Sequence, residues 1–200
     1  MRRTTLTTVI CLLFAGAAFA GEHNLDYLLG HFEKTASIFQ NEIEGLSEAQ
    51  WRFKPAPDRW SVAECAQHIV LSEDFLRELI ADKVLGAPAA PPDAGGKLRG
   101  SDDDVLGMAV DRSFRAKAPE PLQPAPAAGE PADLVREFAA RRAKTVALVR
   151  DSAARLRSHR MDHPIGKSLD AFQWLLFLSG HTERHVLQIR EVKAHSDFPK

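Results

Sequence analysis

The chain has 200 residues, of which 26 are Lys or Arg and 27 are Asp or Glu, so its formal charge at pH 7 is only −1. This balance, without a long basic run, argues against a nucleic-acid-binding protein. Of the two cysteines, Cys11 falls in a segment that we expect to be removed, so Cys65 has no partner for an intrachain disulfide. The fold must therefore be held by packing, with or without a bound metal.

The first twenty residues predict a secretory signal peptide. Two arginines precede an apolar run that ends in Ala18-Phe19-Ala20, the small-x-small pattern of a cleavage site. We expect cleavage after Ala20, a single domain over residues 21–200, and a periplasmic or secreted location. No later apolar run approaches the roughly 20 residues that a spanning helix needs, so no membrane association is expected after cleavage.

Two long helices are predicted in the first half of this domain. Apolar residues recur at steps of three and four over about residues 24–46, which is typical of an amphipathic helix. A Pro-x-Pro sequence then interrupts the helical pattern. Ser61 and Glu64 have the spacing of a capping box, which predicts a second helix that begins there and runs to about Val84.

A change of composition marks the middle of the chain. Residues 85–131 hold eight of the twelve prolines, which predicts a long crossover connection and not a helix. One short helix is expected within it, at about Asp102–Val110. A connection of this length is usually functional or mobile.

Two more long helices are predicted after the crossover. The third starts near Pro131, since proline is favoured at a first helical position, and its pattern continues through Leu156. Ser168 with Asp170 opens the fourth, which runs to about Ala194. Four long helices with short, long and short connections predict an all-α protein, a four-helix bundle with one crossover between the second and third helices.

The fourth predicted helix carries two histidines four residues apart, His181 and His185. On an ideal helix such positions are about 6 Å apart along the axis and about 40° apart around it, so both rings can reach one ion. Both lie at the border of the apolar face. A pair of this kind is, by itself, also compatible with two solvated or hydrogen-bonded histidines.

The second predicted helix carries a comparable residue, His68, at the border of its own apolar face. Three neutral imidazoles near a bundle interior would each need a hydrogen-bond partner, whereas one divalent cation satisfies all three. Three protein ligands with one open position is the pattern of a catalytic metal site. The alternative is that His68 bonds only a backbone carbonyl at the edge of the core.

The remaining histidines need no metal. His31 lies beside the apolar stripe of the first helix and is compatible with a buried or a solvent-exposed position. Three others fall near the predicted ends of elements. We expect these to face water: His23, His159 and His195.

Two stretches, "WSVAECAQHI" from Trp60 and "HTERHVLQI" from His181, together with "APEPLQP" before the third helix, resemble the DinB-like (DinB/YfiT) superfamily. The resemblance implies a four-helix bundle and a divalent metal ion, zinc, nickel, manganese or iron, bound by three histidines. Their positions fall on His68, His181 and His185. It also implies thiol-dependent transfer as one chemistry. The proline-rich crossover departs from the family pattern, so the resemblance implies nothing about the residues at the entrance of the site.

Three residues near these histidines are candidates for a chemical role. Glu64, one turn before His68, is a candidate proton carrier, although capping already explains it. His163 is a candidate catalytic residue that approaches from the loop before the fourth helix; the alternative is a turn residue before Pro164. Cys65 is a candidate fourth ligand, with a small buried apolar residue as the alternative.

Three further residues are candidates for supporting the site. Gln188, one turn beyond His185, is expected to donate a hydrogen bond that fixes a ligand, with packing or solvent exposure as the alternative. Trp60 and Trp174 are expected to line apolar walls near the site, with plain core packing as the alternative.

These patterns lead to one main hypothesis of function and two alternatives. The first is an exported, metal-dependent hydrolase or thiol-dependent transferase that acts on a small molecule through a metal-activated water or thiol. An exported location weakens the thiol version, because small thiols are mainly cytoplasmic. The alternatives are a non-catalytic metal-binding or homodimerising interaction module, and a bundle without metal.

Overall fold

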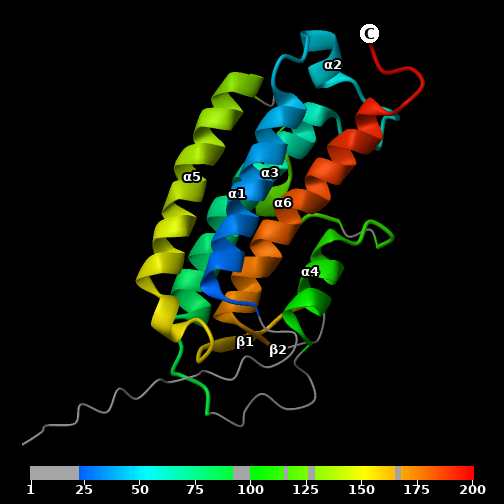
Figure 1. Ribbon diagram of the computed structural model, residues 1–200. Helices are drawn as coiled ribbons and strands as arrows, with labels where there is room; N and C mark the ends of the chain where they lie inside the picture. The colour runs from blue at the N-terminus through cyan, green and yellow to red at the C-terminus, as the bar shows by residue number, and fades with distance from the viewer. Residues whose placement is uncertain (1–22, 92–99, 115–116, 126–128, 165–167) are drawn as a thin grey trace, which may run out of the picture.

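The computed structural model describes residues 23–91, 100–114, 117–125, 129–164 and 168–200. The predicted signal peptide lies outside this part of the chain. Four long helices pack side by side (Figure 1), which confirms the predicted bundle. They are α1 (Leu25–Ile43), α3 (Val62–Leu79), α5 (Pro131–Asp151) and α6 (Ala171–Lys193). None of the described helices is long and apolar enough to cross a bilayer.

Shorter elements connect the four helices. Helix α2 precedes α3, a π-helical turn η1 extends α3, and the crossover contains α4 and the 3₁₀ turn η2. After α5 come the 3₁₀ turn η3 and a two-stranded antiparallel sheet. Their bounds are α2 Glu48–Arg52, η1 Ile80–Val84, α4 Asp102–Val110, η2 Glu120–Leu122, η3 Ala153–Arg155, β1 Arg160–Asp162 and β2 Ser168–Asp170.

The helix starts follow from side-chain caps. The predicted capping box is confirmed: the Glu64 backbone N–H donates to Ser61 Oγ, and the Ser61 backbone N–H donates to Glu64 Oε2. Asp170 and Gln173 form the equivalent box at the start of α6. Each box satisfies backbone N–H groups that have no partner inside the helix.

Three predicted boundaries were wrong. The first helix ends at Ile43, because Gly45 has a φ of 73° and turns the chain into α2, which the sequence reading missed. The third helix ends at Asp151 and not at Leu156. Ser168 belongs to β2, where it pairs with Asp162, so only Asp170 serves as the cap of the fourth helix.

The apolar core consists of two clusters at opposite ends of the bundle. One contains Leu28 of α1 and Leu175 of α6, and the other contains Phe39 of α1 and Ile189 of α6. Between them lies a layer of buried polar side chains from all four long helices. These are His31, Thr35, His68, Ser72, Glu73, Arg142, Thr145, Ser179, Thr182 and His185.

Arg142 of α5 is the hub of this polar layer. Its guanidinium donates to both carboxylate oxygens of Glu73, at 2.8 and 2.9 Å. It also donates to the carbonyl of Phe32 and to the hydroxyl oxygens of Thr35 and Thr182. All five N–H donors of the guanidinium are therefore satisfied by groups on α1, α3 and α6.

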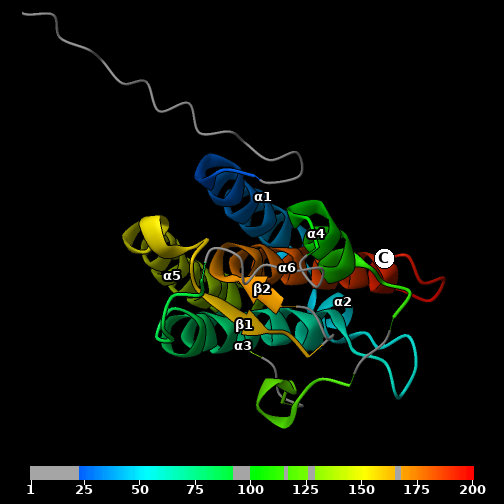
Figure 2. The same cartoon turned by 90° about the horizontal axis from the view of Figure 1, so that it is seen from below.

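Helix α6 packs against α1, α3 and α4, and the view from below shows α4 beside it (Figure 2). Gly180 makes the contact with α4 close, since a Cβ there would lie 2.8 Å from the Cβ of Ala109. Asp102 at the start of α4 is fully buried and accepts hydrogen bonds from Arg157 and Gln173. The crossover is thus fixed to the side of α6.

We predict that the buried ion pair is essential for stability. Glu73→Gln leaves the Arg142 charge buried without a counter-charge and should lower the free energy of unfolding by about 3–5 kcal/mol, measured by chemical denaturation. Asp133→Asn, which breaks the exposed pair with Arg136, is the control and should cost less than about 1 kcal/mol. A Glu73→Gln loss no larger than that of the control would contradict the prediction.

Candidate metal centre

The structure brings His68, His181 and His185 together. His68 lies on α3, and the other two lie one turn apart on α6. One nitrogen from each of the three rings lies within 4.8 Å of the other two, and no carboxylate or thiol among the described residues belongs to this group. The Nε2 atoms of His181 and His185 are 3.2 Å apart. Three nitrogens at this separation can share one ion.

Oxygen acceptors fix the orientation of two of the rings. His68 Nδ1 lies 2.7 Å from the carbonyl oxygen of Leu122 in η2, and His185 Nδ1 lies 2.9 Å from Oε1 of Gln188. Each Nδ1 therefore carries the proton that it donates, which leaves the lone pair on Nε2. This is the tautomer in which Nε2 binds a metal.

Burial keeps the three imidazoles neutral. It lowers the pKa of His181 to about 3, and the nearby His68 and Arg184 charges add to the shift. Burial also lowers the pKa of His185 well below its usual value, as do the other two histidines, and it lowers the pKa of His68. Neutral rings are the form that binds a metal ion.

Aromatic rings surround the three histidines. The Trp60 ring lies 4.9 Å from that of His68 and 6.1 Å from that of His185, centroid to centroid, so this tryptophan lines the site as expected. Phe177, which the sequence reading did not single out, lies 6.2 Å from His181. Trp174 belongs to the apolar core and contacts Phe177, so Phe177 lies between Trp174 and the histidines.

His163 is also separated from the histidine cluster. Its ring packs against Trp174 and Phe177, at 4.7 and 4.5 Å, and burial lowers its pKa. Phe177 therefore stands between His163 and His181. His163 contributes to the apolar surroundings of the site and does not join the group of three nitrogens.

Two other candidates have structural roles. The Glu64 carboxylate bonds the Ser61 backbone N–H and the Lys54 ammonium, so capping and an ion pair occupy it. Cys65 is fully buried among apolar side chains, which raises the pKa of its thiol. Because the thiolate is the form that binds metals, this environment suits an apolar residue and not a fourth ligand.

The predictions for the other histidines were partly wrong. His159 does not face water: it is 8 % exposed, and its Nδ1 lies 3.1 Å from the Arg155 carbonyl oxygen. His31 is buried in the polar layer, with Nδ1 2.7 Å from Ser179 Oγ. His23 stacks on Tyr27 and pairs with Asp103, at intermediate exposure.

Two arginines lie at the edge of the histidine cluster. Arg112, just after α4, holds Glu191 through two hydrogen bonds and also donates to Gln188 Oε1 at 3.4 Å. Arg184 donates to the carbonyl oxygen of Phe114. The sequence reading identified Gln188, although as a hydrogen-bond donor, whereas its Oε1 is the acceptor of the bond to His185. It missed Arg112 and Leu122, because both lie in the crossover, where no helical period indicates which residues point inward.

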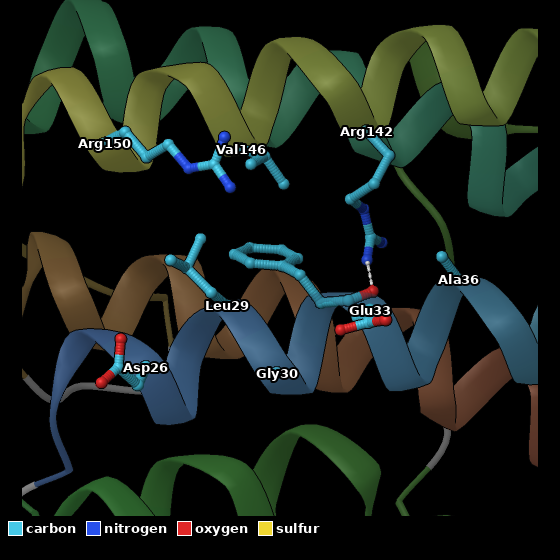
Figure 3. Close-up of a pocket in the computed structure, with 9 residues that line it drawn as sticks. Asp26, Leu29, Gly30, Glu33, Ala36, Arg142, Val146 and Arg150 are labelled. Carbon is cyan, nitrogen blue, oxygen red and sulfur yellow. Dashed lines mark hydrogen bonds between the residues drawn. The ribbon is translucent and has the colours of Figure 1, made fainter.

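The structure has a hollow next to the cluster and a groove far from it. The hollow, of about 310 Å³, is lined by Trp60 and Gln188, both of which contact the histidines. The groove, of about 380 Å³, runs between α1 and α5 and is lined by residues such as Leu29 and Arg150 (Figure 3). None of the three clustered histidines lines the groove, whereas the hollow lies next to Trp60 and Gln188, which contact them.

The chain is similar in sequence to known proteins. Residues 31–189 match the model of the DinB superfamily. The uncharacterized protein YuaE of Bacillus subtilis (strain 168) is 26 % identical over 153 residues, which cover 76 % of this chain and 89 % of YuaE.

A solved structure shares the fold. It is YfiT from Bacillus subtilis, described as a probable metal-dependent hydrolase with an unusual four-helix bundle topology. The superposition covers 90 % of this chain and 97 % of YfiT, with a TM-score of 0.54 and 13 % identity. The family match spans most of the four-helix bundle and includes all three clustered histidines, and on this basis the chain belongs to the DinB superfamily.

Proposed function

We propose that this protein is an exported enzyme that binds a divalent metal ion through His68, His181 and His185 and acts on a small molecule as a hydrolase or thiol-dependent transferase. The observation that carries the proposal is the convergence of three neutral imidazoles from two helices within 4.8 Å. The description of YfiT as a probable metal-dependent hydrolase supports the same class of chemistry.

The donor set fits a borderline divalent cation such as zinc, nickel or iron better than manganese, which prefers oxygen ligands. Imidazole nitrogen suits these ions, and three ligands leave an open position. When bound, such an ion supplies Lewis acidity that lowers the pKa of a water or thiol at that position. The tautomers that these hydrogen bonds require of His68 and His185 leave their Nε2 lone pairs available to the ion.

The protein's own residues supply orientation and a dry environment. Leu122 and Gln188 hold two of the rings, so these ligands need little rearrangement to bind. Trp60 and Phe177 cover the rings with apolar surface, which excludes water from one side. The hollow beside Trp60 and Gln188 offers room for a substrate of small-molecule size.

The location in the periplasm or outside the cell is part of the proposal and rests on the first twenty residues alone. Their basic start, apolar run and Ala18-Phe19-Ala20 sequence support it. Secretion with cleavage after Ala20, seen as a mature N-terminus at Gly21 by mass spectrometry of exported protein, would agree with this part of the proposal.

Metal binding is tested first by stoichiometry. We expect about one equivalent of a divalent ion per chain after incubation with zinc, nickel or manganese salts and removal of excess, measured by elemental analysis. His185→Ala removes one of three ligands and should abolish stoichiometric binding. His23→Ala, which changes a histidine that pairs with Asp103 outside the cluster, is the control and should bind as the wild type does. Less than a tenth of an equivalent in the wild type would refute the site.

Gln188 should tune the affinity without being a ligand. Gln188→Ala removes the acceptor of the His185 Nδ1–H, so the ring is no longer fixed, and we expect the Kd for zinc to rise about 10- to 100-fold. Competition with a chromophoric chelator measures this Kd. A variant that binds zinc as tightly as the wild type would show that the hydrogen bond does not position the ligand.

Turnover is tested with ester, amide and thiol-plus-electrophile substrates. We expect one class to be converted, with the activity lost on chelation and restored by one equivalent of metal. His181→Ala should lower kcat/KM at least about 100-fold, because Lewis acidity contributes several kcal/mol to such reactions. Metal-loaded protein that converts none of these substrates would favour a non-catalytic metal-binding module.

A further inference from the structure

The edge of the histidine cluster carries a cationic side chain that donates to an uncharged acceptor. Arg184 lies three residues after His181 on α6, so the two side chains are neighbours on the helix surface. Its guanidinium donates to the backbone carbonyl of Phe114, an uncharged acceptor. Within the described part of the chain, no carboxylate forms an ion pair with Arg184.

Asp111 and Glu191 are the carboxylates whose negative charge acts on Arg184, and both already accept hydrogen bonds from other residues. Asp111 accepts hydrogen bonds from the backbone N–H and the hydroxyl of Ser113. Glu191 accepts two hydrogen bonds from Arg112, at 3.0 and 2.8 Å. Arg112 is therefore paired with a carboxylate, whereas the guanidinium of Arg184 has N–H groups available for another acceptor.

The charge of the proposed metal site also favours an anionic ligand. All three ligands are neutral imidazoles, and no carboxylate belongs to the group, so the ligands would leave the charge of a divalent ion uncompensated. The guanidinium of Arg184 adds a further positive charge. In a partly buried site of low dielectric, this excess positive charge favours an anion.

Backbone contacts hold Arg184 against the same crossover that contacts His68. The crossover passes the cluster at two points: the Leu122 carbonyl holds His68, and the Phe114 carbonyl holds Arg184. Both carbonyls thus belong to the same connection, and it borders the cluster on the side where Arg184 lies. A guanidinium fixed at one end in this way is pre-oriented to bind an oxyanion through its remaining N–H groups.

We propose that Arg184 binds an anionic oxygen group of the substrate, a carboxylate or a phosphate, beside the ion held by the three histidines. This inference rests on the proposed metal site and specifies the substrate class. Arg184 acts as a specificity residue: it selects substrates that carry such a group and contributes no ligand to the metal.

The test uses the cobalt(II)-loaded protein, whose visible absorption responds to anion binding near the metal. Sodium acetate and inorganic phosphate are titrated at constant ionic strength, with acetamide as the neutral counterpart of acetate. Arg184→Gln keeps hydrogen-bonding capacity but removes the charge, and we expect it to raise the Kd of at least one anion about tenfold or more. Arg184→Lys should recover part of the affinity.

Arg190→Gln is the matched control, because Arg190 lies on the same helix but pairs with Glu42 on the outside of the bundle. It should bind both anions as the wild type does. A larger effect on acetate assigns a carboxylate substrate, and a larger effect on phosphate assigns a phosphate.

Cobalt content and thermal unfolding are measured for every variant, which separates the two hypotheses. Wild-type protein that takes up no cobalt overturns the metal site and this inference with it. Cobalt-loaded Arg184→Gln with a wild-type Kd for both anions, or acetamide that binds as tightly as acetate and phosphate, overturns this inference alone.

Discussion

The buried ion pair between Arg142 and Glu73 is the interaction on which the arrangement of the bundle depends. A charged pair inside a helical bundle stabilises only if every donor and acceptor is satisfied, because desolvation of the two charges is expensive. Here the guanidinium uses all five donors, and Thr145 adds a hydrogen bond of 2.7 Å to Glu73. Phe32 and Phe138 pack on the guanidinium, each with its ring centroid 4.7 Å away. The geometry leaves little freedom, so the pair fixes how four helices are rotated relative to one another.

That rotation determines where the histidines point. Arg142 bonds Thr182, which is next to His181 in α6, and Glu73 lies little more than one turn from His68 in α3. Arg142 holds Glu73 of α3 and Thr182 of α6 on its own side of the contact between these helices. The histidines of α3 and α6 therefore point to the other side of this contact and meet there. A purely apolar layer would pack in several helix rotations, and only some of them would bring three imidazoles together. The Arg142–Glu73 pair and its threonine partners therefore specify the site without contributing a ligand.

The sequence predicted the long helices from local rules, whereas the three histidines that the structure brings together were singled out by helix spacing combined with the family resemblance. Periodicity and the Ser61–Glu64 cap do not depend on distant contacts. The rest could not be predicted for a physical reason. The partner of the His68 ring is the backbone carbonyl of Leu122, and any residue type offers such a carbonyl. His159 looked like a surface residue at an element end, yet it is buried directly before β1, and its carbonyl accepts a hydrogen bond from the Ala171 N–H. A three-residue strand pairing has too little pattern to detect in the sequence.

The helices of this protein are held together without a bound metal ion. In a small zinc domain the metal supplies the folding free energy, and the metal-free chain is unfolded. In this protein two apolar clusters and the Arg142–Glu73 network hold the helices independently of the histidines. Leu122 and Gln188 satisfy the outer nitrogens of two rings without any metal, and the inner Nε2 atoms of His181 and His185 face each other at 3.2 Å. A site of this kind is preformed: an ion that enters it meets ligands that are already neutral and oriented, and its binding free energy is not spent on ordering the chain.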